Sequence, residues 1–333
     1  MSPLPPGTTP WPTPDPFLFC VHHRDQYPAG DARLAPRVSL EGRQLGSDFA
    51  GKDGWSMYHG RTIPGFPQHP HRGFETVTVV REGLLDHSDS MGAAARYGQG
   101  DVQWLTAGAG IQHAEMFPLL KTDAENPFEL FQIWLNLPRA RKMVRPHFKM
   151  LWSDSLARRG YQDQQGKLTE LTLMAGKLGD LVAPVPPPDS WAADPANQVN
   201  IWTLKLSPRA QWTLPPAPGS NRTLYFFSGQ ELGINGVSVP PRHYIRLTGD
   251  GEVLIENGAG SSELLLLGGR PIAEPIARRG PFVMNTEAEI RQAYADYRAT
   301  QFGGWPWSRS DPHHGTAPKR FARHADGQRE EPS

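Results

Sequence analysis

The chain has 333 residues, of which 38% are hydrophobic, and this is enough to build the cores of two medium-sized domains. Its 34 Lys and Arg residues equal its 34 Asp and Glu residues in number, so the formal net charge is zero. A neutral chain has no long-range attraction for phosphate backbones or anionic lipids, and we expect neither direct nucleic-acid binding nor membrane association. Glycine and proline each number 34, which favours many short strands separated by turns.

The single cysteine and the N-terminal residues bear on the cellular compartment. Cys20 has no partner for an internal disulfide and lies among apolar residues, which fits a buried thiol in a reducing compartment. The first residues contain neither a basic segment nor an apolar run typical of a secretion signal, and no later apolar run approaches the length of a membrane span. We therefore predict a soluble, cytoplasmic protein.

The first histidine motif reads Gln-His-Pro-His-Arg-Gly at 68–73 and leads into a predicted strand at 75–80. Alternate side chains of an extended chain share a face, so His69 and His71 point the same way. At this spacing the two imidazoles can bind one metal ion together. Glu75 is the acidic residue next to this motif.

The second histidine motif follows the glycine-rich turn at 107–110 and contains His113 and Glu115, again two positions apart. If the two strands are neighbours with these faces inward, three imidazoles and one carboxylate converge on a point. This donor set is typical of a mid-row transition metal, and iron, manganese, nickel, copper and zinc are all compatible with it.

A further strand is predicted at 129–137. One of its faces carries Leu130, Gln132, Trp134 and Asn136. Two interpretations stay open: this face lines a pocket, or it belongs to an ordinary sandwich strand whose tryptophan packs in the core.

The second half of the chain predicts another barrel and one helix. The proline-rich run at 182–188 cannot form a central strand, so a crossing between domains is expected there. The strand-rich block at 201–267 contains a single histidine and faintly repeats the strand at 76–83 in its residues 223–229. We therefore expect a second barrel of the same kind, free of metal.

A capping box of Thr286 and Glu289 predicts the start of a helix that spans about 287–300. Its apolar residues recur at the spacing of one helical face and must dock on a barrel: they are Ile290, Ala293, Tyr294 and Tyr297.

Three stretches of the sequence, HPHRGFETVTVV, GDVQWLTAGAGIQHAE and GPFVMNTEAEIRQAYADY, strongly resemble the pirin family of the cupin superfamily. The resemblance implies an all-β fold of two cupin-type jelly-roll barrels with a C-terminal α-helix. It also implies a non-haem metal, Fe(II), whose ligands are His69, His71, His113 and Glu115. A typical cupin takes its carboxylate from the first motif, so Glu75 is the second choice for the fourth ligand.

Six segments are expected on these grounds. They are a flexible arm at 1–16, the N-terminal metal-binding cupin barrel at 17–150, a connecting segment at 151–200, the C-terminal cupin-like barrel without metal ligands at 201–275, a helix segment at 276–304 and a polar tail at 305–333.

The resemblance to pirins and quercetinases implies a flavonol 2,3-dioxygenase, in which the substrate hydroxyl is deprotonated and dioxygen opens the central ring with loss of carbon monoxide. Either Glu115 or Glu75 is expected to accept the hydroxyl proton. Aromatic residues near the motifs are expected to form the walls for a flat substrate: they are Phe66, Phe74, Trp104, Phe117 and Trp134.

Two other classes of function compete with the dioxygenase. One, which the pirin resemblance also implies, is a regulatory protein whose metal oxidation state alters a surface for an unidentified protein partner. The other is a different cupin metal enzyme, such as a sugar-phosphate isomerase or a hydrolase, which requires basic residues around the site. Only Arg72 is adjacent to the motifs in sequence.

Overall fold

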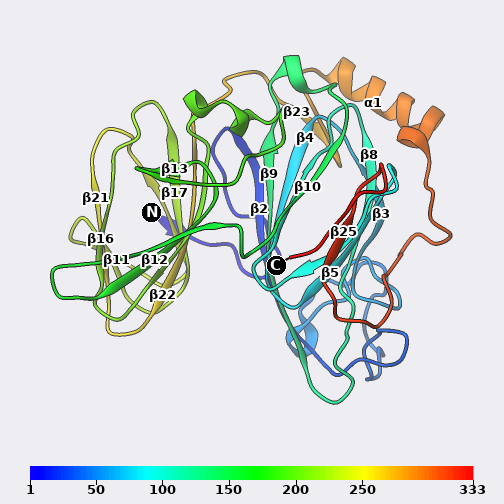
Figure 1. Ribbon diagram of the computed structural model, residues 1–333, viewed down its shortest axis with the longest axis horizontal. Helices are drawn as coiled ribbons and strands as arrows, with labels where there is room; N and C mark the ends of the chain where they lie inside the picture. Colours follow the sequence, from blue (N-terminus) through cyan, green and yellow to red (C-terminus); the bar gives the residue numbers. More distant parts are fainter. Residues whose placement is uncertain (333) are drawn as a thin grey trace. The chain divides into compact units, whose positions relative to one another are not determined.

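The computed structural model describes residues 1–332 and divides into two compact units. The N-terminal barrel consists of residues 7–10, 20–154 and the chain from Glu274 onward, and the C-terminal barrel of residues 1–6, 11–19 and 155–273. Both are built mainly of strands, and α1 (Glu287–Thr300) is the one α-helix within residues 1–332 (Figure 1). The predicted all-β fold with a C-terminal helix is confirmed.

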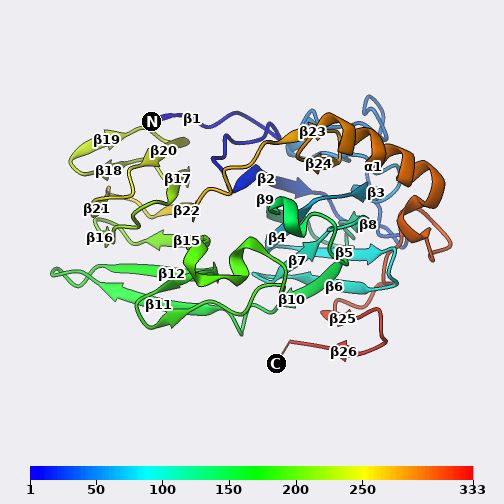
Figure 2. The same ribbon diagram turned by 90° about the horizontal axis from the view of Figure 1, so that it is seen from above.

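The N-terminal barrel contains a five-stranded and a six-stranded antiparallel sheet (Figure 2). The first has the order β10 (His147–Leu151), β7 (Val102–Thr106), β4 (Phe74–Glu82), β9 (Asn126–Asn136) and β2 (Phe17–Tyr27). The second has the order β26 (Arg329–Glu330), β25 (Phe321–Arg323), β6 (Ala94–Gly98), β5 (Leu84–Asp89), β8 (Ile111–Met116) and β3 (Gly65–His71). The Thr78 hydroxyl of β4 donates to Glu115 of β8, so the two sheets face one another across the interior.

Smaller elements complete this unit. They are the hairpin of β23 (Ala277–Arg279) and β24 (Phe282–Met284), and the 3-10 helices η1 (Lys52–Gly54), η2 (Arg139–Arg141) and η5 (Gln301–Gly303).

The C-terminal barrel packs a seven-stranded sheet against a four-stranded one. The first has the order β1 (Ser2–Pro3), β20 (His243–Leu247), β17 (Asn221–Ser228), β22 (Ser262–Gly269), β15 (Asn200–Leu206), β12 (Leu168–Ala175) and β11 (Ala157–Gln162). The second has the order β16 (Gln211–Leu214), β21 (Val253–Asn257), β18 (Leu232–Ile234) and β19 (Val237–Val239). The hairpin of β13 (Lys177–Leu178) and β14 (Leu181–Val182) and the helices η3 (Trp191–Ala193) and η4 (Pro195–Asn197) complete the unit.

The inner face of the C-terminal barrel is apolar because its strands alternate. In β15, Trp202, Leu204 and Leu206 enter the core, whereas Lys205 between them is exposed. Two apolar rows from the opposed sheets interdigitate in this way, which is the usual means by which a β-sandwich buries its core.

Three segments are more ordered than the sequence indicates. Residues 151–200, expected to connect the barrels, contain β11 and β12, which join the seven-stranded sheet through pairing with β15. In the expected flexible arm at 1–16, Trp11 is buried and stacks on Tyr225 at 5.3 Å between ring centroids. The expected polar tail adds β25 to the edge of β6, and the buried guanidinium of Arg96 donates to the Gly315 and Ala317 carbonyls.

The helix α1 begins and ends where the sequence predicts. The Thr286 hydroxyl accepts from the Glu289 amide and the Glu289 carboxylate accepts from the Thr286 amide, which is the predicted capping box. Ile290 and Ala293 are fully buried in an apolar cluster with Phe282 and other side chains of the β23–β24 hairpin. The helix thus docks on the N-terminal unit through its apolar stripe.

Replacing Ile290 with alanine is expected to lower the free energy of unfolding by about 2–5 kcal/mol, because the lost side chain leaves a cavity between the helix and the hairpin. Urea denaturation followed by circular dichroism measures the effect. Arg291→Ala, at an exposed position of the same helix, is the control and should shift the free energy by less than about 0.5 kcal/mol. Equal free energies of unfolding for the two variants would show that the apolar face of α1 does not stabilise its docking on the hairpin.

Candidate metal centre

The histidines of the two motifs meet because β3 and β8 are antiparallel neighbours. His69 lies directly opposite His113 in the ladder, and a register shift between Phe66 and His69 places Phe66 opposite Glu115. Cross-strand partners share a face of the sheet, and so do residues two apart. His71 and Glu115 therefore extend the same inward-facing row as the opposed histidine pair.

The three imidazoles form one tight cluster. Their nearest ring nitrogens all lie within 4.8 Å of one another. Ring centroids are separated by 4.4 Å for His69 and His113, 4.8 Å for His69 and His71, and 4.9 Å for His71 and His113. His71 and His113 are buried, and His69 is partly exposed.

The hydrogen bonding of these rings leaves nitrogen lone pairs for a ligand. His69 Nδ1 lies 2.9 Å from the Pro67 carbonyl and donates to it, which leaves Nε2 as the free acceptor. Within residues 1–332, both ring nitrogens of His113 and Nδ1 of His71 are buried without a hydrogen-bond partner. A buried polar atom without a hydrogen-bond partner destabilises the fold, and coordination of a metal ion removes this cost for an imidazole nitrogen.

Burial keeps the imidazoles neutral, as metal ligands must be. It lowers the pKa of His69 to about 4, and it lowers the pKa of His71 and of His113 well below the usual value of an imidazole. The donor set and its protonation state therefore fit a divalent transition metal of the kind that the sequence predicts.

Glu115 lies at the edge of this cluster. Its Oε2 is 3.9 Å from His113 Nε2, and its Oε1 accepts from the Thr78 hydroxyl at 3.1 Å. Thr78 is also within 2.7 Å of the Gln132 side-chain oxygen, so a polar row crosses the barrel between the sheets. Burial raises the pKa of Glu115 to about 7.

Two of the predicted site residues are not brought to the histidines. Thr78 of β4 points inward, and strand alternation therefore turns Glu75 and Val77 to the opposite face of the sheet. Trp104 pairs with Val77 and shares that outer face. Glu75 accepts from the Thr106 hydroxyl there, so geometry favours Glu115 over Glu75 as the carboxylate of the site.

The remaining predicted wall residues divide into two groups. Trp134 is half-buried, with its ring 5.3 Å from that of His71 and 4.2 Å from that of Phe74, so it lines the site rather than the barrel core. Phe66 is half-buried beside His69, at 6.4 Å between rings. Phe117 is fully buried and belongs to the apolar core.

The sequence analysis missed His87 and Asp89 on β5. They pair with Glu115 and His113 on β8 and continue the inward row, with His87 Nε2 3.2 Å from Asp89 Oδ2. Their spacing of two positions is the same signal that identified the other pairs. Arg278 was also missed, and its guanidinium lies 4.7 Å above the Trp134 ring.

Arg72, between the first motif and its strand, is a structural anchor. Its Nε donates to the Ala109 carbonyl at 2.6 Å and its Nη1 pairs with Asp296 of α1 at 2.6 Å. Gly73 follows with a φ of 86°, and an added Cβ would lie 1.9 Å from the Val283 carbonyl oxygen. The helix and the β23–β24 hairpin thus hold the chain immediately after His71.

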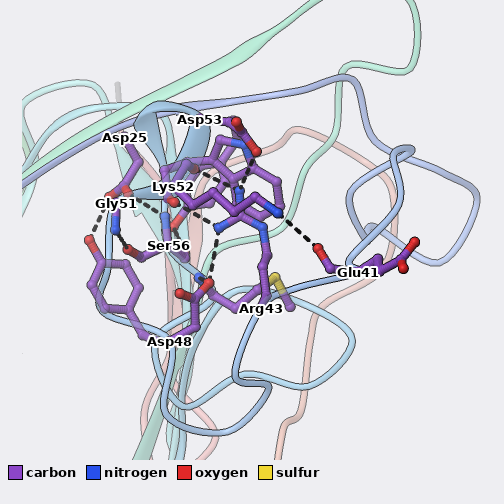
Figure 3. A network of polar contacts seen from close by, with 12 residues as sticks. Asp25, Glu41, Arg43, Asp48, Gly51, Lys52, Asp53 and Ser56 are labelled. Atoms are coloured by element: carbon purple, nitrogen blue, oxygen red, sulfur yellow. Dashed lines mark hydrogen bonds and ion pairs between the residues drawn. The ribbon is translucent and has the colours of Figure 1, made fainter.

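A polar network holds the loop before β3, and its members include Asp25, Arg43 and Asp48 (Figure 3). The Arg43 guanidinium, itself covered, donates to Asp48 at 3.0 Å and to the Trp55 carbonyl at 2.9 Å, which fixes the loop before β3. In the same loop the Tyr58 hydroxyl donates to Asp25 at 2.7 Å. Tyr58 stacks on Phe66 at 5.2 Å, so the network positions one wall of the site.

Within residues 1–332, no helix has both the length and the apolar character that a membrane crossing requires.

Comparison with known proteins agrees with this architecture. The chain is 34% identical to the human protein named Pirin over 245 residues, which are 72% of this chain and 78% of the relative. It is 34% identical over 238 residues to a Pseudomonas aeruginosa protein provisionally named a quercetin 2,3-dioxygenase, covering 72% of this chain and 79% of the relative. A crystal structure of quercetin 2,3-dioxygenase from Acinetobacter baumannii matches with a TM-score of 0.68 and 28% identity over 87% of each chain.

Two family patterns match the sequence itself. The one described as Pirin matches residues 35–135, and the one described as Pirin C-terminal cupin domain matches residues 201–303. Each match falls mainly within one of the two barrels. The chain therefore belongs to the pirin family, with cupin-type barrels.

Proposed function

We propose that this chain binds one divalent transition metal, Fe(II), through His69, His71, His113 and Glu115. The observation that carries the proposal is the gathering of three imidazoles, two of them buried and one partly exposed, whose nitrogens lie within 4.8 Å of one another. Within residues 1–332, both ring nitrogens of His113 are buried without a hydrogen-bond partner. Imidazoles with one carboxylate suit a mid-row metal and leave coordination positions open for substrate.

We further propose that the activity is that of a flavonol 2,3-dioxygenase. The similarity to an Acinetobacter baumannii quercetin 2,3-dioxygenase over most of both chains supports this reaction class. So does the site, because Trp134 and Phe66 offer half-buried aromatic faces on either side of the histidines. A bound iron would supply a Lewis acid and an electron path between the flavonol and dioxygen.

The protein's own contribution is to bind and deprotonate the substrate. Three neutral imidazoles and one carboxylate offset only one of the two charges of a divalent ion, so the site favours an anionic flavonolate. In this proposal Glu115 Oε2 accepts the proton of the 3-hydroxyl. The contacts that support the role are the Thr78 hydroxyl, which donates to the other carboxylate oxygen, and His113 Nε2, which lies 3.9 Å from Oε2. Both atoms of dioxygen then enter the product, and one ring carbon leaves as carbon monoxide.

A double variant, His69→Ala with His71→Ala, is expected to reduce the metal content to background, because two of the three imidazole ligands are lost. Elemental analysis of the purified protein measures this. His243→Ala removes a histidine of the C-terminal barrel and should keep the natural metal content. Full occupancy in a correctly folded double variant would show that the metal is held elsewhere.

Glu115→Gln is expected to weaken metal affinity roughly tenfold or more, since the carboxylate ligand becomes a neutral amide. Glu75→Gln is the matched control, because Glu75 is a second buried carboxylate of the same barrel and faces away from the histidines. The metal affinity of this variant should stay within about twofold of that of the natural protein. Competition with a chromophoric chelator gives both affinities. An equal loss of metal affinity in the two variants would mean that Glu75 is the ligand, or that the carboxylates affect metal binding only indirectly.

The iron-loaded protein should consume dioxygen with quercetin and release carbon monoxide, and should do so at least about a hundredfold more slowly with 3-O-methylquercetin, which has no 3-hydroxyl proton to lose. An oxygen electrode and product chromatography follow the reaction. Binding of quercetin without oxygen uptake or ring-opened product would refute the dioxygenase proposal and leave the metal proposal intact.

A further inference from the structure

The C-terminal barrel contains a cavity of about 710 Å³, a size typical of small-molecule sites. Its floor is apolar and includes Trp202, Leu214 and Leu266 from the barrel core. Its rim consists of two proline-rich loops, at 182–186 and 215–218. Prolines fix the backbone of both loops, so the cavity is largely formed before a ligand arrives.

One charged group is built into this apolar cavity. Arg222 lies on β17 two residues before Leu224, on the inward face of the strand, and only 3% of its surface is exposed. Gly268 and Leu247 are its cross-strand partners, so it sits at the end of the barrel where the cavity opens.

The guanidinium is held by neutral groups alone. Its Nη1 donates to the Pro215 carbonyl at 2.5 Å, and its Nη2 donates to the Thr248 carbonyl at 2.6 Å and the Gly251 carbonyl at 3.2 Å. Its Nε is buried and has no acceptor within residues 1–332. Within residues 1–332, no carboxylate lies within ion-pair distance of Arg222. Burial lowers the pKa of its guanidinium, and the Asp250 carboxylate opposes this from beyond ion-pair distance.

The charge of the cavity wall is therefore unbalanced. A buried cation without a carboxylate in direct contact is costly, and an anion of the right shape recovers part of that cost. Lys177 adds a second positive charge to the lining, and the one carboxylate among the described lining residues, Asp194, is exposed and caps η4. Val182 and Val185 also line the cavity and are 62% and 72% exposed, so they offer apolar surface to a ligand.

We propose that this cavity binds a small organic anion, an apolar body with one carboxylate or sulfonate group, whose charge pairs with Arg222 and whose hydrocarbon part lies against Trp202, Leu214 and Leu266. The site is independent of the metal centre: it uses residues of the C-terminal barrel only.

Two fluorescent probes of nearly equal shape test the charge requirement. They are 1-anilinonaphthalene-8-sulfonate, an anion, and N-phenyl-1-naphthylamine, its neutral counterpart, each titrated into the metal-loaded full chain. Arg222→Met is expected to weaken binding of the anion roughly tenfold or more, and binding of the neutral probe less than about twofold, because only the former loses a buried charge partner. Equal weakening of both probes would refute the anion site.

A second variant tests the proposal without removing the buried Arg222, so the test does not depend on the folding of Arg222→Met. Val182→Asp puts a negative charge at the exposed rim, and it should weaken binding of the anion by about threefold or more without affecting the neutral probe comparably. Val237→Asp, at a 54% exposed position of the same barrel outside the cavity, is the control and should leave both affinities unchanged. Unchanged binding of the anion in Val182→Asp would overturn the proposal.

Discussion

The candidate metal centre depends on one constraint, the antiparallel register between β3 and β8. A slip of one residue would turn His69 and His71 to the other face of the sheet, because side chains alternate with a period of two. The register is set by the irregularity between Phe66 and His69 and by Gly65, where an added Cβ would lie 2.4 Å from the Glu115 carbonyl oxygen. Close backbone approach at one glycine thus fixes where the imidazoles meet.

The interior of the N-terminal barrel is unusually polar for a protein core. Besides the histidine cluster, it encloses Gln103, whose side-chain amide is fully buried without a partner within residues 1–332. An unsatisfied buried polar group costs about 1–3 kcal/mol, so these side chains favour a bound ion or substrate that satisfies them. Binding is stabilising for the same reason, since whatever binds the folded state alone shifts the equilibrium toward it.

The two barrels share one architecture but enclose different sets of side chains. The inward positions of the N-terminal barrel carry histidines, a carboxylate and hydroxyl or amide side chains at its centre, whereas those of the C-terminal barrel carry Trp202, Leu204 and Leu224. Among the described residues of the second barrel, Arg222 is the one charged side chain that is buried. Function in each unit is decided by a few inward-facing side chains on a shared scaffold, not by the scaffold itself.

The sequence by itself determined the all-β class, the two histidine motifs and the helix. Each rests on a local signal, namely strand or helix periodicity and the capping box at Thr286. It did not determine which face of β4 enters the site. That strand is buried on both faces from Phe74 to Val80, so its sequence lacks the alternation that would have turned Glu75 and Trp104 outward in the prediction.

Only the tertiary structure brought His87 into the inward row and ordered the polar tail. It also buried Arg222 with no carboxylate of residues 1–332 in direct contact. The tail pairs β25 with β6 and satisfies Arg96 through carbonyls about 220 residues away, and no local pattern encodes such a contact. Strand register and long-range pairing decide which polar groups become neighbours, whereas local sequence decides only that the strands exist.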